Sequence, residues 1–394
     1  MTTRAFAFAN LIGGDNKISL EALPDEATGG GDTLGTVNGS NIDLSTGSFF
    51  EVTANDQTLG FSNVPNVKDF KIKLTGAGTV RGYDLVNASY DNASFSFASQ
   101  DVVPTDITFN NDGTKMYIVG RGTDTVHQYT LSPAWDISTA SYDNVSFSVK
   151  TQDDAPTGIT FNNDGTKMYM VGLVSVSVHQ YTLSTAWDIS TASYDSVAFD
   201  FSIQETFSAE ALTFNHDGTK MYLVGRGGNT VHQYTLFPAW DISTASYDNI
   251  SFSVATQDSD PLGIAFNNDG TKMYITGTST NSVHQYTLST PWDISTATYD
   301  SVAFDVSLQE SFCQGVSFKP DGTKMFIIGS SSDKVWQYST SVITNRTITY
   351  PNPVKFPSGT KPTDPAIGEV DILEFVTFDG GTTYYAYQLG DDHR

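Results

Sequence analysis

The sequence of 394 residues predicts an all-β protein, a five-bladed β-propeller inserted into a small β-sandwich. Three observations lead to this fold. A segment of about 52 residues recurs five times, each of the first four copies contains four strand-like runs, and the strand-rich flanks are too short to bury a core separately.

The repeat is clearest in the stretch TGITFNNDGTKMYMVG, residues 157–172, which has a near-copy in every unit. The aspartates of the five copies are 52, 53, 52 and 52 residues apart: Asp112, Asp164, Asp217, Asp269 and Asp321. A fixed period of this length indicates repeated structural units.

Each of the first four units supplies four short runs rich in Val, Ile, Thr, Tyr and Phe, separated by turn residues. In the second unit these runs are GITF, KMYMVG, VHQYTL and VAFDFS, which begin at residues 158, 167, 178 and 197. No unit has a long stretch of helical periodicity, which excludes a helical solenoid. Four strands in about 52 residues are typical of a propeller blade.

The ends of the repeat predict how the ring closes. The last unit stops at the run VWQY, residues 335–338, and lacks an outer strand, whereas a spare one, ASFSF, lies upstream at residues 93–97. Pairing the two completes a fifth blade and leaves no open sheet edge. The segment VRGYDL, residues 80–85, is then surplus, and a sixth, incomplete blade is the alternative.

The flanks predict one interrupted domain. Residues 42–79 and 346–394 both alternate strand-like runs with Gly, Pro and Asn turns, and joining KIKLTGAG to TITYP suggests one continuous hairpin. We therefore expect a β-sandwich made of these two halves, with the propeller at 80–345 in one of its loops. Residues 1–41, with three glycines at 29–31, are expected to be an attachment segment and linker.

Composition narrows the function. The chain has 20 Lys and Arg against 44 Asp and Glu, a net charge of -24, which disfavours nucleic acid and anionic membranes as partners. No apolar run is long enough for a membrane span, and from the first residues we expect no secretory signal. Cys313 is the only cysteine, so no intrachain disulfide forms.

The recurring polar residues are mostly expected to be structural. The Asn-Asn-Asp-Gly words suit hairpin turns, with glycine at positive φ, better than a calcium loop. The lysines that follow them are expected to be solvated. Four equivalent histidines and four equivalent tryptophans are expected to pack, the histidines between blades: His127, His179, His232, His284, Trp135, Trp187, Trp240 and Trp292.

One set of acids follows a glutamine in every unit, between the outer strand and the next inner strand. Because this loop runs toward the ring axis, the five acids are candidates for a negative rim or a cation site, the alternative being solvated loop charge. The set is Asp101, Asp153, Glu205, Asp258 and Glu310.

Comparison of the repeats with one another favours one face for binding. The NNDG turn and the WDISTASYD connection hardly change, whereas the second-to-third strand loop and the blade-to-blade loop do. In an antiparallel blade the variable connections share one face, so we expect it to bind a ligand, with tolerated drift as the alternative. The candidates are Arg121, Asp124, Leu173, Val174, Phe207, Arg226, Asn229, Thr278, Asn281, Phe312, Ser331 and Asp333.

Two resemblances add to these inferences. The words NDGTKMYIVG and TVHQYTL look like blades of lactonase-like and surface-layer propellers. The flanks, with DLSTGSFFEVT, FSNVP, ITYPNPVKFPSGTKPT and FVTFDGGTTYYAYQLG, resemble a small β-domain of bacteriophage tail and fibre proteins, although Phe356 stands where many relatives have Trp. DGTKMY-type propellers also occur in marine phages.

The phage resemblance implies a virion protein that presents the propeller face to a host-surface glycan or protein. It would contact other virion proteins through its N-terminal segment and sandwich, as a homo-oligomer. No GxSxG, HExxH, P-loop or dinucleotide motif is present, so we expect no catalytic residue, metal or cofactor. The rivals are a purely structural decoration protein and a lactonase-like or glycan-cleaving enzyme.

Overall fold

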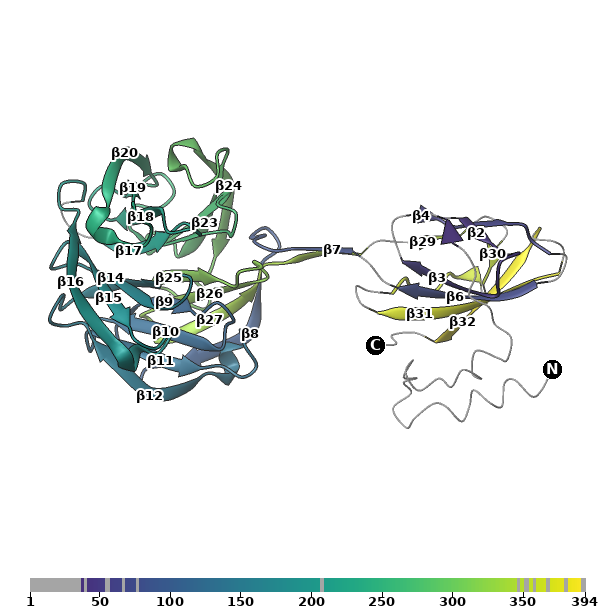
Figure 1. The fold of residues 1–394 in the computed structure, drawn as a ribbon, viewed down its shortest axis with the longest axis horizontal. Helices are drawn as coiled ribbons and strands as arrows, with labels where there is room; N and C mark the ends of the chain where they lie inside the picture. The colour runs from purple at the N-terminus through teal and green to yellow at the C-terminus, as the bar shows by residue number, and fades with distance from the viewer. Residues whose placement is uncertain are drawn as a thin grey trace. The chain divides into compact units, whose positions relative to one another are not determined.

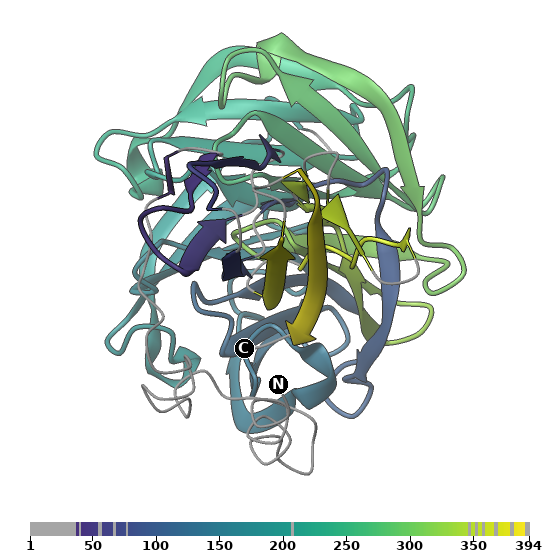
Figure 2. The same ribbon diagram turned by 90° about the vertical axis from the view of Figure 1, so that its right-hand side faces the viewer.

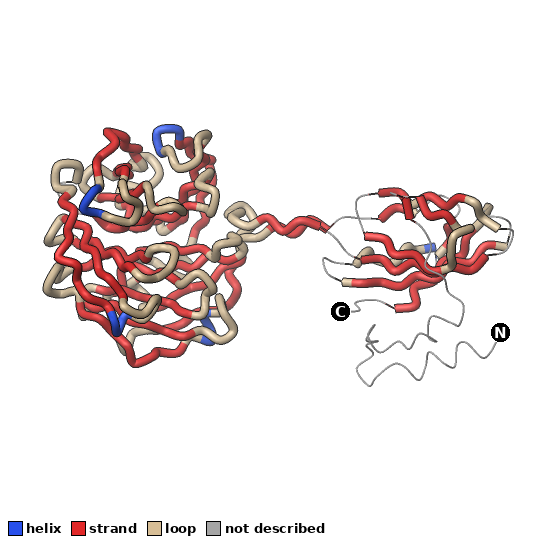
Figure 3. The backbone as a smooth tube through the Cα atoms, viewed as in Figure 1, coloured by secondary structure: helices blue, strands red, loops and turns tan. Residues whose placement is uncertain are grey.

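The computed structural model describes residues 37–38, 41–53, 57–65, 68–75, 78–205, 209–345, 348–350, 354–356, 359–365, 369–378 and 382–390. The chain divides into two compact units, residues 81–342 and residues 1–80 with 343–394. Strands dominate both, and the helices are single short turns (Figure 3), which confirms the all-β class. In the described part of the chain, no helix has the length and apolar character needed to cross a membrane.

The larger unit is a propeller of five four-stranded antiparallel blades, as predicted (Figure 1). Blade 1 runs β9 (Pro104–Phe109), β10 (Lys115–Gly120), β11 (Thr125–Thr130) and β12 (Ser141–Ser148). Blade 2 contains β13 (Pro156–Phe161), β14 (Lys167–Gly172), β15 (Ser177–Leu183) and β16 (Ala192–Asp200). Blade 3 contains β17 (Ala209–Phe214), β18 (Lys220–Gly225), β19 (Thr230–Thr235) and β20 (Ser246–Ser253). Blade 4 contains β21 (Pro261–Phe266), β22 (Lys272–Gly277), β23 (Ser282–Leu288) and β24 (Ala297–Asp305).

Blade 5 is assembled from both ends of the propeller. It contains β25 (Cys313–Phe318), β26 (Lys324–Gly329) and β27 (Lys334–Ser339), and its outer strand is β8 (Ser89–Ser96). The partners Val335↔Phe95 and Trp336↔Ser94 fix the register, and Figure 2 shows the blue β8 beside the yellow-green strands. The predicted pairing of the spare strand is confirmed.

The segment VRGYDL is not surplus, so that prediction is wrong. Its Tyr83 has φ +62, close to the +64 of Trp135, and its N–H donates to the Gly322 carbonyl at 2.6 Å as that of Trp135 donates to Gly113 at 3.0 Å. The words YDLVNASYD and WDISTASYD are therefore equivalent. Tyr83 belongs to blade 5, and the described residues contain no sixth blade.

Apolar side chains fill the spaces between blades. Met116 and Ile118 of blade 1 pack with Phe326 and Ile328 of blade 5 in one buried cluster. Full burial of such a side chain contributes roughly 1.5–3 kcal/mol. Tyrosines of the second strands also join neighbouring blades by donating to the carbonyl of the next tryptophan: Tyr117 to Trp187 at 2.6 Å, Tyr169 to Trp240 at 2.5 Å and Tyr222 to Trp292 at 2.5 Å.

The smaller unit combines both flanks of the chain. Its five-stranded sheet has the order β3 (Phe49–Thr53), β6 (Lys68–Thr75), β31 (Val370–Thr377), β32 (Tyr384–Gly390), β30 (Val354–Lys355). A three-stranded sheet holds β1 (Val37–Asn38), β2 (Asn41–Asp43) and β5 (Gly60–Ser62). In the core of the smaller unit the rings of Phe70 and Phe375 stack with their centroids 5.1 Å apart. The flanks thus form one unit, and its classification as a sandwich stays a prediction.

The predicted hairpin between KIKLTGAG and TITYP is wrong. Strand β6 pairs with β31, whereas β29 (Ile348–Thr349) pairs in parallel with β4 (Gln57–Thr58). The chain enters and leaves the propeller through β7 (Gly78–Arg81) and β28 (Val342–Asn345), which pair with each other. The attachment role predicted for residues 1–41 falls almost entirely outside the described residues.

Candidate active site at the propeller axis

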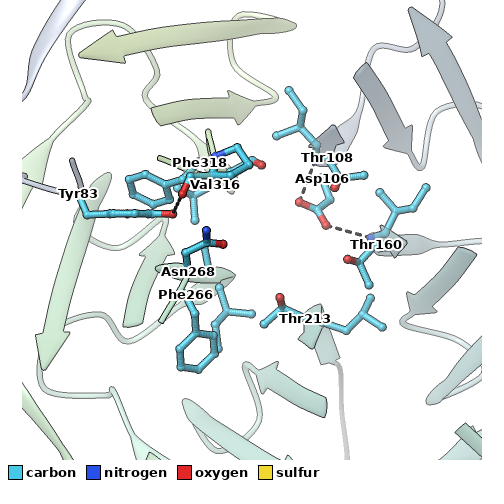
Figure 4. A pocket seen from close by; sticks show the side chains of 16 residues that line it. Tyr83, Asp106, Thr108, Thr160, Thr213, Phe266, Asn268, Val316 and Phe318 are labelled. Carbon is cyan, nitrogen blue, oxygen red and sulfur yellow. Dashed lines mark hydrogen bonds between the residues drawn. The ribbon is translucent and has the colours of Figure 1, made fainter. Parts of the chain in front are cut away.

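A pocket lies on the propeller axis and is lined by the inner strands of all five blades, β9, β13, β17, β21 and β25 (Figure 4). Its volume is about 190 Å³. Pockets for drug-sized ligands are typically about 300–1,000 Å³, so this one suits a small molecule. Five blades leave a narrow axial space, and each contributes one strand to its wall.

Hydroxyl groups line the middle of the pocket. The fifth residue of the inner strand is Thr108, Thr160, Thr213 or Ser317 in four blades and Ala265 in the other. Asn268 and Pro320, which lie in turns between first and second strands, line the pocket together with Tyr83. The five inner-strand positions, four of which carry a hydroxyl group, form what we call the hydroxyl ring. The pocket therefore extends from the hydroxyl ring toward the face that carries these turns.

Asp106 contributes a carboxyl group to the wall of the pocket. Three of the other inner strands have glycine at this position and one has alanine: Gly158, Ala211, Gly263 and Gly315. A Cβ on Gly315 would lie 2.5 Å from Asp106 Oδ1, so the small residue of the neighbouring blade makes room for the carboxyl group. Among the lining residues that the structure describes, Asp106 is the one carboxylic acid.

Two backbone groups hold the Asp106 carboxyl group in place. Oδ1 accepts the N–H of Ile107 at 2.8 Å, and Oδ2 accepts that of Ile159 in the next blade at 2.9 Å. Figure 4 shows the carboxyl group held between these two strands at the edge of the cavity. A carboxylate accepts about four hydrogen bonds, so each oxygen keeps a free lone pair.

Burial sets the protonation of Asp106. The residue is 7% exposed, and burial raises its pKa to about 7, against the opposing effect of the N–H groups of Ile159 and Ile107. A buried carboxyl group that titrates near neutrality can both accept and return a proton. Asp106 was not among the residues predicted from the sequence, although the contrast between PTDITF and PTGITF marks it.

Tyr83 is the second residue that the sequence analysis missed. Its hydroxyl donates to the Pro320 carbonyl at 2.9 Å, and burial raises its pKa to about 12. The phenol therefore stays protonated at neutral pH and forms a fixed wall of the pocket. The alignment of YDL with WDI would have placed it.

The Asn-Asn-Asp-Gly words are turns, as predicted. Asp164 Oδ1 accepts the N–H of Thr166 at 2.9 Å, and Gly165 has φ +71. A Cβ on Gly165 would lie 2.3 Å from the Trp187 ring, so the repeated tryptophan covers the repeated glycine. Both fixed connections thus meet on one face.

The lysines after these turns begin the second strands, as predicted, and Lys115 keeps 30% of its side chain exposed, but they are paired rather than only solvated. Each of the five reaches an aspartate of its blade's outer strand; Lys115 Nζ lies 2.6 Å from Asp143 Oδ2 and Lys324 Nζ lies 2.6 Å from Asp91 Oδ2. The aspartate lies two strands away from the lysine, and the Thr130 hydroxyl between them accepts from Lys115 Nζ at 2.7 Å and donates to Asp143 Oδ1 at 2.6 Å.

The five repeated acids form neither a solvated rim nor a shared cation site. Asp101, Asp153, Glu205, Asp258 and Glu310 are at most 3% exposed. Each accepts hydrogen bonds from its own blade's second-to-third strand loop; Asp101 Oδ2 accepts the Thr123 N–H at 2.9 Å and its hydroxyl at 2.6 Å. Because each acid lies in a blade-to-blade loop, these hydrogen bonds join that loop to the second-to-third strand loop. In the described part of the chain, no three His, Cys, Asp or Glu residues are grouped to hold a metal.

The histidines have ring partners within their own blades, and the predicted packing between blades stays a prediction. His127 Nε2 lies 3.2 Å from the Thr123 hydroxyl, and its ring meets that of Tyr142 in the same blade at 5.9 Å. Burial lowers the pKa of His127, so the neutral imidazole persists to lower pH.

The variable-face candidates separate into two groups. Asp124, Asn229, Asn281 and Asp333 occupy one repeated loop corner with φ between +48 and +52, a conformation that Asn and Asp tolerate, so their identity has a backbone reason. Arg121, Leu173, Thr278 and Ser331 lie in the same loops, where Val174 is 65% exposed, and Phe312 in a blade-to-blade loop is 42% exposed. Phe207 lies outside the described residues.

The comparisons with known proteins concern the propeller. The family "Lactonase, 7-bladed beta-propeller" matches residues 105–291, somewhat less than half of the chain, and this segment includes Asp106. The present propeller has five blades rather than seven. No curated protein matches the sequence.

Several solved structures are similar to this chain at low scores. They include a candidate 6-phosphogluconolactonase from Bacteroides uniformis (11% identity, TM-score 0.39, covering 73% of this chain and 84% of that one). The periplasmic gluconolactonase of Pseudomonas aeruginosa has 14% identity and TM-score 0.38 over 62% and 70% of the two chains. The Cps50 (Swd1) propeller of Myceliophteria thermophila has 9% identity and TM-score 0.37 over 64% and 99%. These low scores carry no argument about function.

The family match corrects the functional predictions. A non-enzymatic virion protein with a host-recognition face is the wrong interpretation of this propeller, because the matched segment points to a lactonase-like protein. The resemblance of the flanks to phage tail domains, and the location, partners and oligomer that it implies, stay predictions.

Proposed function

We propose that the propeller is a lactonase-type hydrolase that opens a small cyclic ester in the axial pocket. The observation that carries the proposal is Asp106, a buried carboxyl group with a pKa near 7 in a small pocket, inside the segment that matches the lactonase family. An ester hydrolase needs a base that removes a proton from water at neutral pH. Asp106 has the chemistry and the location for that role.

In the proposed reaction the Asp106 carboxylate accepts a proton from water as the water oxygen bonds to the ester carbonyl carbon. The tetrahedral intermediate then collapses, the ring C–O bond breaks, and Asp106 returns the proton to the departing alkoxide. The product is one hydroxy acid, and Asp106 is restored. The N–H groups of Ile107 and Ile159 hold the carboxyl group still throughout.

The hydroxyl ring supports this chemistry. Thr108, Thr160 and Thr213 face the same opening as Asp106 (Figure 4), where hydroxyl groups can donate to an ester carbonyl as negative charge develops on its oxygen. Apolar residues such as Ile107 and Ile159 also line the pocket. The small volume favours a compact, lightly substituted ring.

The test is hydrolysis of a panel of γ- and δ-lactones by the purified full-length chain, compared with Asp106→Asn and Asp106→Gly. Glycine is the residue of three other blades at this position, so the glycine variant is compatible with the inner strand. We expect both variants to lose about 10²-fold or more of kcat/KM. In the wild type, kcat/KM rises with pH through about 7 as Asp106 ionises.

Two outcomes would overturn the proposal. One is a wild-type rate no higher than that of buffer across the panel. The other is full activity in a folded Asp106→Asn protein, which would leave Asp106 only the structural task of binding two backbone N–H groups. Circular dichroism and the unfolding midpoint verify the fold of each variant.

A further inference from the structure

Two arginines occupy equivalent places on the variable face, Arg121 in blade 1 and Arg226 in blade 3. Each follows the glycine that ends the second strand, in the words VGRG. They differ in their partners, and this difference is independent of the axial pocket and of the proposed hydrolysis.

Arg226 is neutralised within the protein. Its Nε lies 2.5 Å from Asp260 Oδ1 in the next blade-to-blade loop, and one terminal nitrogen lies 3.6 Å from Glu210 Oε1 in its own inner strand. Glu210 is 3% exposed, so the guanidinium meets acidic groups over the start of two inner strands. In blade 3, therefore, the arginine at this position is paired with carboxylates.

Arg121 lacks both acids. The residue equivalent to Glu210 in blade 1 is Thr105, and the residue equivalent to Asp260 in the next blade is Ala155. The loops themselves match: the N–H of Ala155 donates to Asp153 Oδ1 at 2.8 Å and that of Asp260 to Asp258 Oδ1 at 2.8 Å. The carbonyls of Ala155 and Asp260 both accept an N–H at 3.1 Å from the neighbouring loop.

The same atom that is paired in Arg226 is unpaired in Arg121. Arg121 Nε is buried and has no hydrogen-bond partner among the described residues. A buried donor without a partner costs about 1–3 kcal/mol, more when charged, and a planar guanidinium binds carboxylate or phosphate oxygens in a fork geometry. Ala155 supplies no carboxylate to Arg121, whereas Asp260 supplies one to Arg226.

We propose that Arg121 is a binding site for an oxyanion group, a carboxylate or phosphate, on the variable face of blades 1 and 2. The bound oxyanion takes the place that the Asp260 carboxylate holds beside Arg226. The protein's net charge of -24 repels anions at long range, so the site depends on short contacts rather than on steering.

The test is titration of the full-length protein with inorganic phosphate and with acetate at a constant ionic strength of about 0.15 M, where long-range repulsion is screened. The readout is the Nε–Hε NMR resonance of Arg121, identified by its loss in Arg121→Gln. We expect a saturable shift with phosphate or acetate that equal concentrations of chloride do not produce.

Two variants make the result decisive. Ala155→Asp places a carboxylate at the position of Asp260 and is expected to abolish the titration while moving the Arg121 resonance toward that of Arg226. Arg226→Gln is the matched control and keeps the response at Arg121. The proposal fails if the wild type shows no saturable shift, or if Ala155→Asp titrates like the wild type.

Discussion

The two faces of the propeller are stabilised in different ways, although both are built from the same repeat. On the turn face, near-identical turns and tryptophans lock together, as in the cover of Gly165 by Trp187. On the variable face, the loops differ in sequence, yet each is fastened by a buried acid such as Asp258. The pocket reaches toward the turn face rather than the variable one, so the variable loops are no guide to its position.

The largest expected effect is on the turn face. Gly165→Ala places a Cβ against the Trp187 ring in a backbone with φ +71, and we expect the free energy of unfolding to fall by about 3 kcal/mol or more. All five tryptophans of the chain lie in the propeller, so urea unfolding followed by their fluorescence reports this unit.

Gly359→Ala is the matched control for that variant. Gly359 has nearly the same φ, +73, but no atom lies within 4 Å of the place that an added Cβ would take, so only the backbone cost of about 1–2 kcal/mol remains. Because Gly359 lies in the smaller unit, its effect is measured by circular dichroism. Equal losses in both variants would show that the tryptophan cover adds nothing.

The next effect concerns the pocket between the faces. The pKa of Asp106 is raised from 3.8 to about 7, so its protonated form is favoured in the native state and stability falls as pH rises from about 4 to about 7. Between pH 5 and pH 8 this removes about 2–3 kcal/mol. Asp106→Gly should lose that part of the slope, measured by urea unfolding at both pH values; an unchanged slope would contradict the shift.

A smaller effect is expected on the variable face. Asp258→Asn weakens the bonds from the Ser279 and Thr280 hydroxyls and should cost about 2 kcal/mol, whereas Asp305→Asn, at an exposed strand end, should cost under 1 kcal/mol. Burial opposes ionisation of Asp258, but the hydrogen bonds prevail and lower its pKa.

The stability that Asp258 contributes depends on pH. A lowered folded-state pKa means that the ionised Asp258 stabilises the protein above about pH 4, the ordinary range of an aspartate, and that this contribution disappears as pH falls through the folded-state value. The cost of Asp258→Asn in urea unfolding should therefore shrink in acid. Equal costs for the Asp258 and Asp305 variants would show that the variable-face loops are not fastened by their acids.

Much of the fold could be predicted because a 52-residue period and a spare outer strand leave few ways to close the ring. The equivalence of Tyr83 with the tryptophans was hidden by a change of residue type, although YDLVNASYD and WDISTASYD share their pattern. The acids were misjudged because their burial depends on how two loops fold over each other. Asp106 stood in the sequence beside glycine equivalents, but its pKa comes from the narrow axial space of five blades.

The composite fifth blade also imposes an order on the synthesis and folding of the molecule. Strand β8 is synthesised before every other blade strand, and its Asp91 accepts a hydrogen bond from Gln337 at 3.0 Å across 246 residues of chain. Pairing over such a distance forms late, because the intervening chain must first be ordered. On the ribosome, therefore, blades 1 to 4 can take shape one after another, while β8 waits with an exposed edge until β27 emerges and closes the ring.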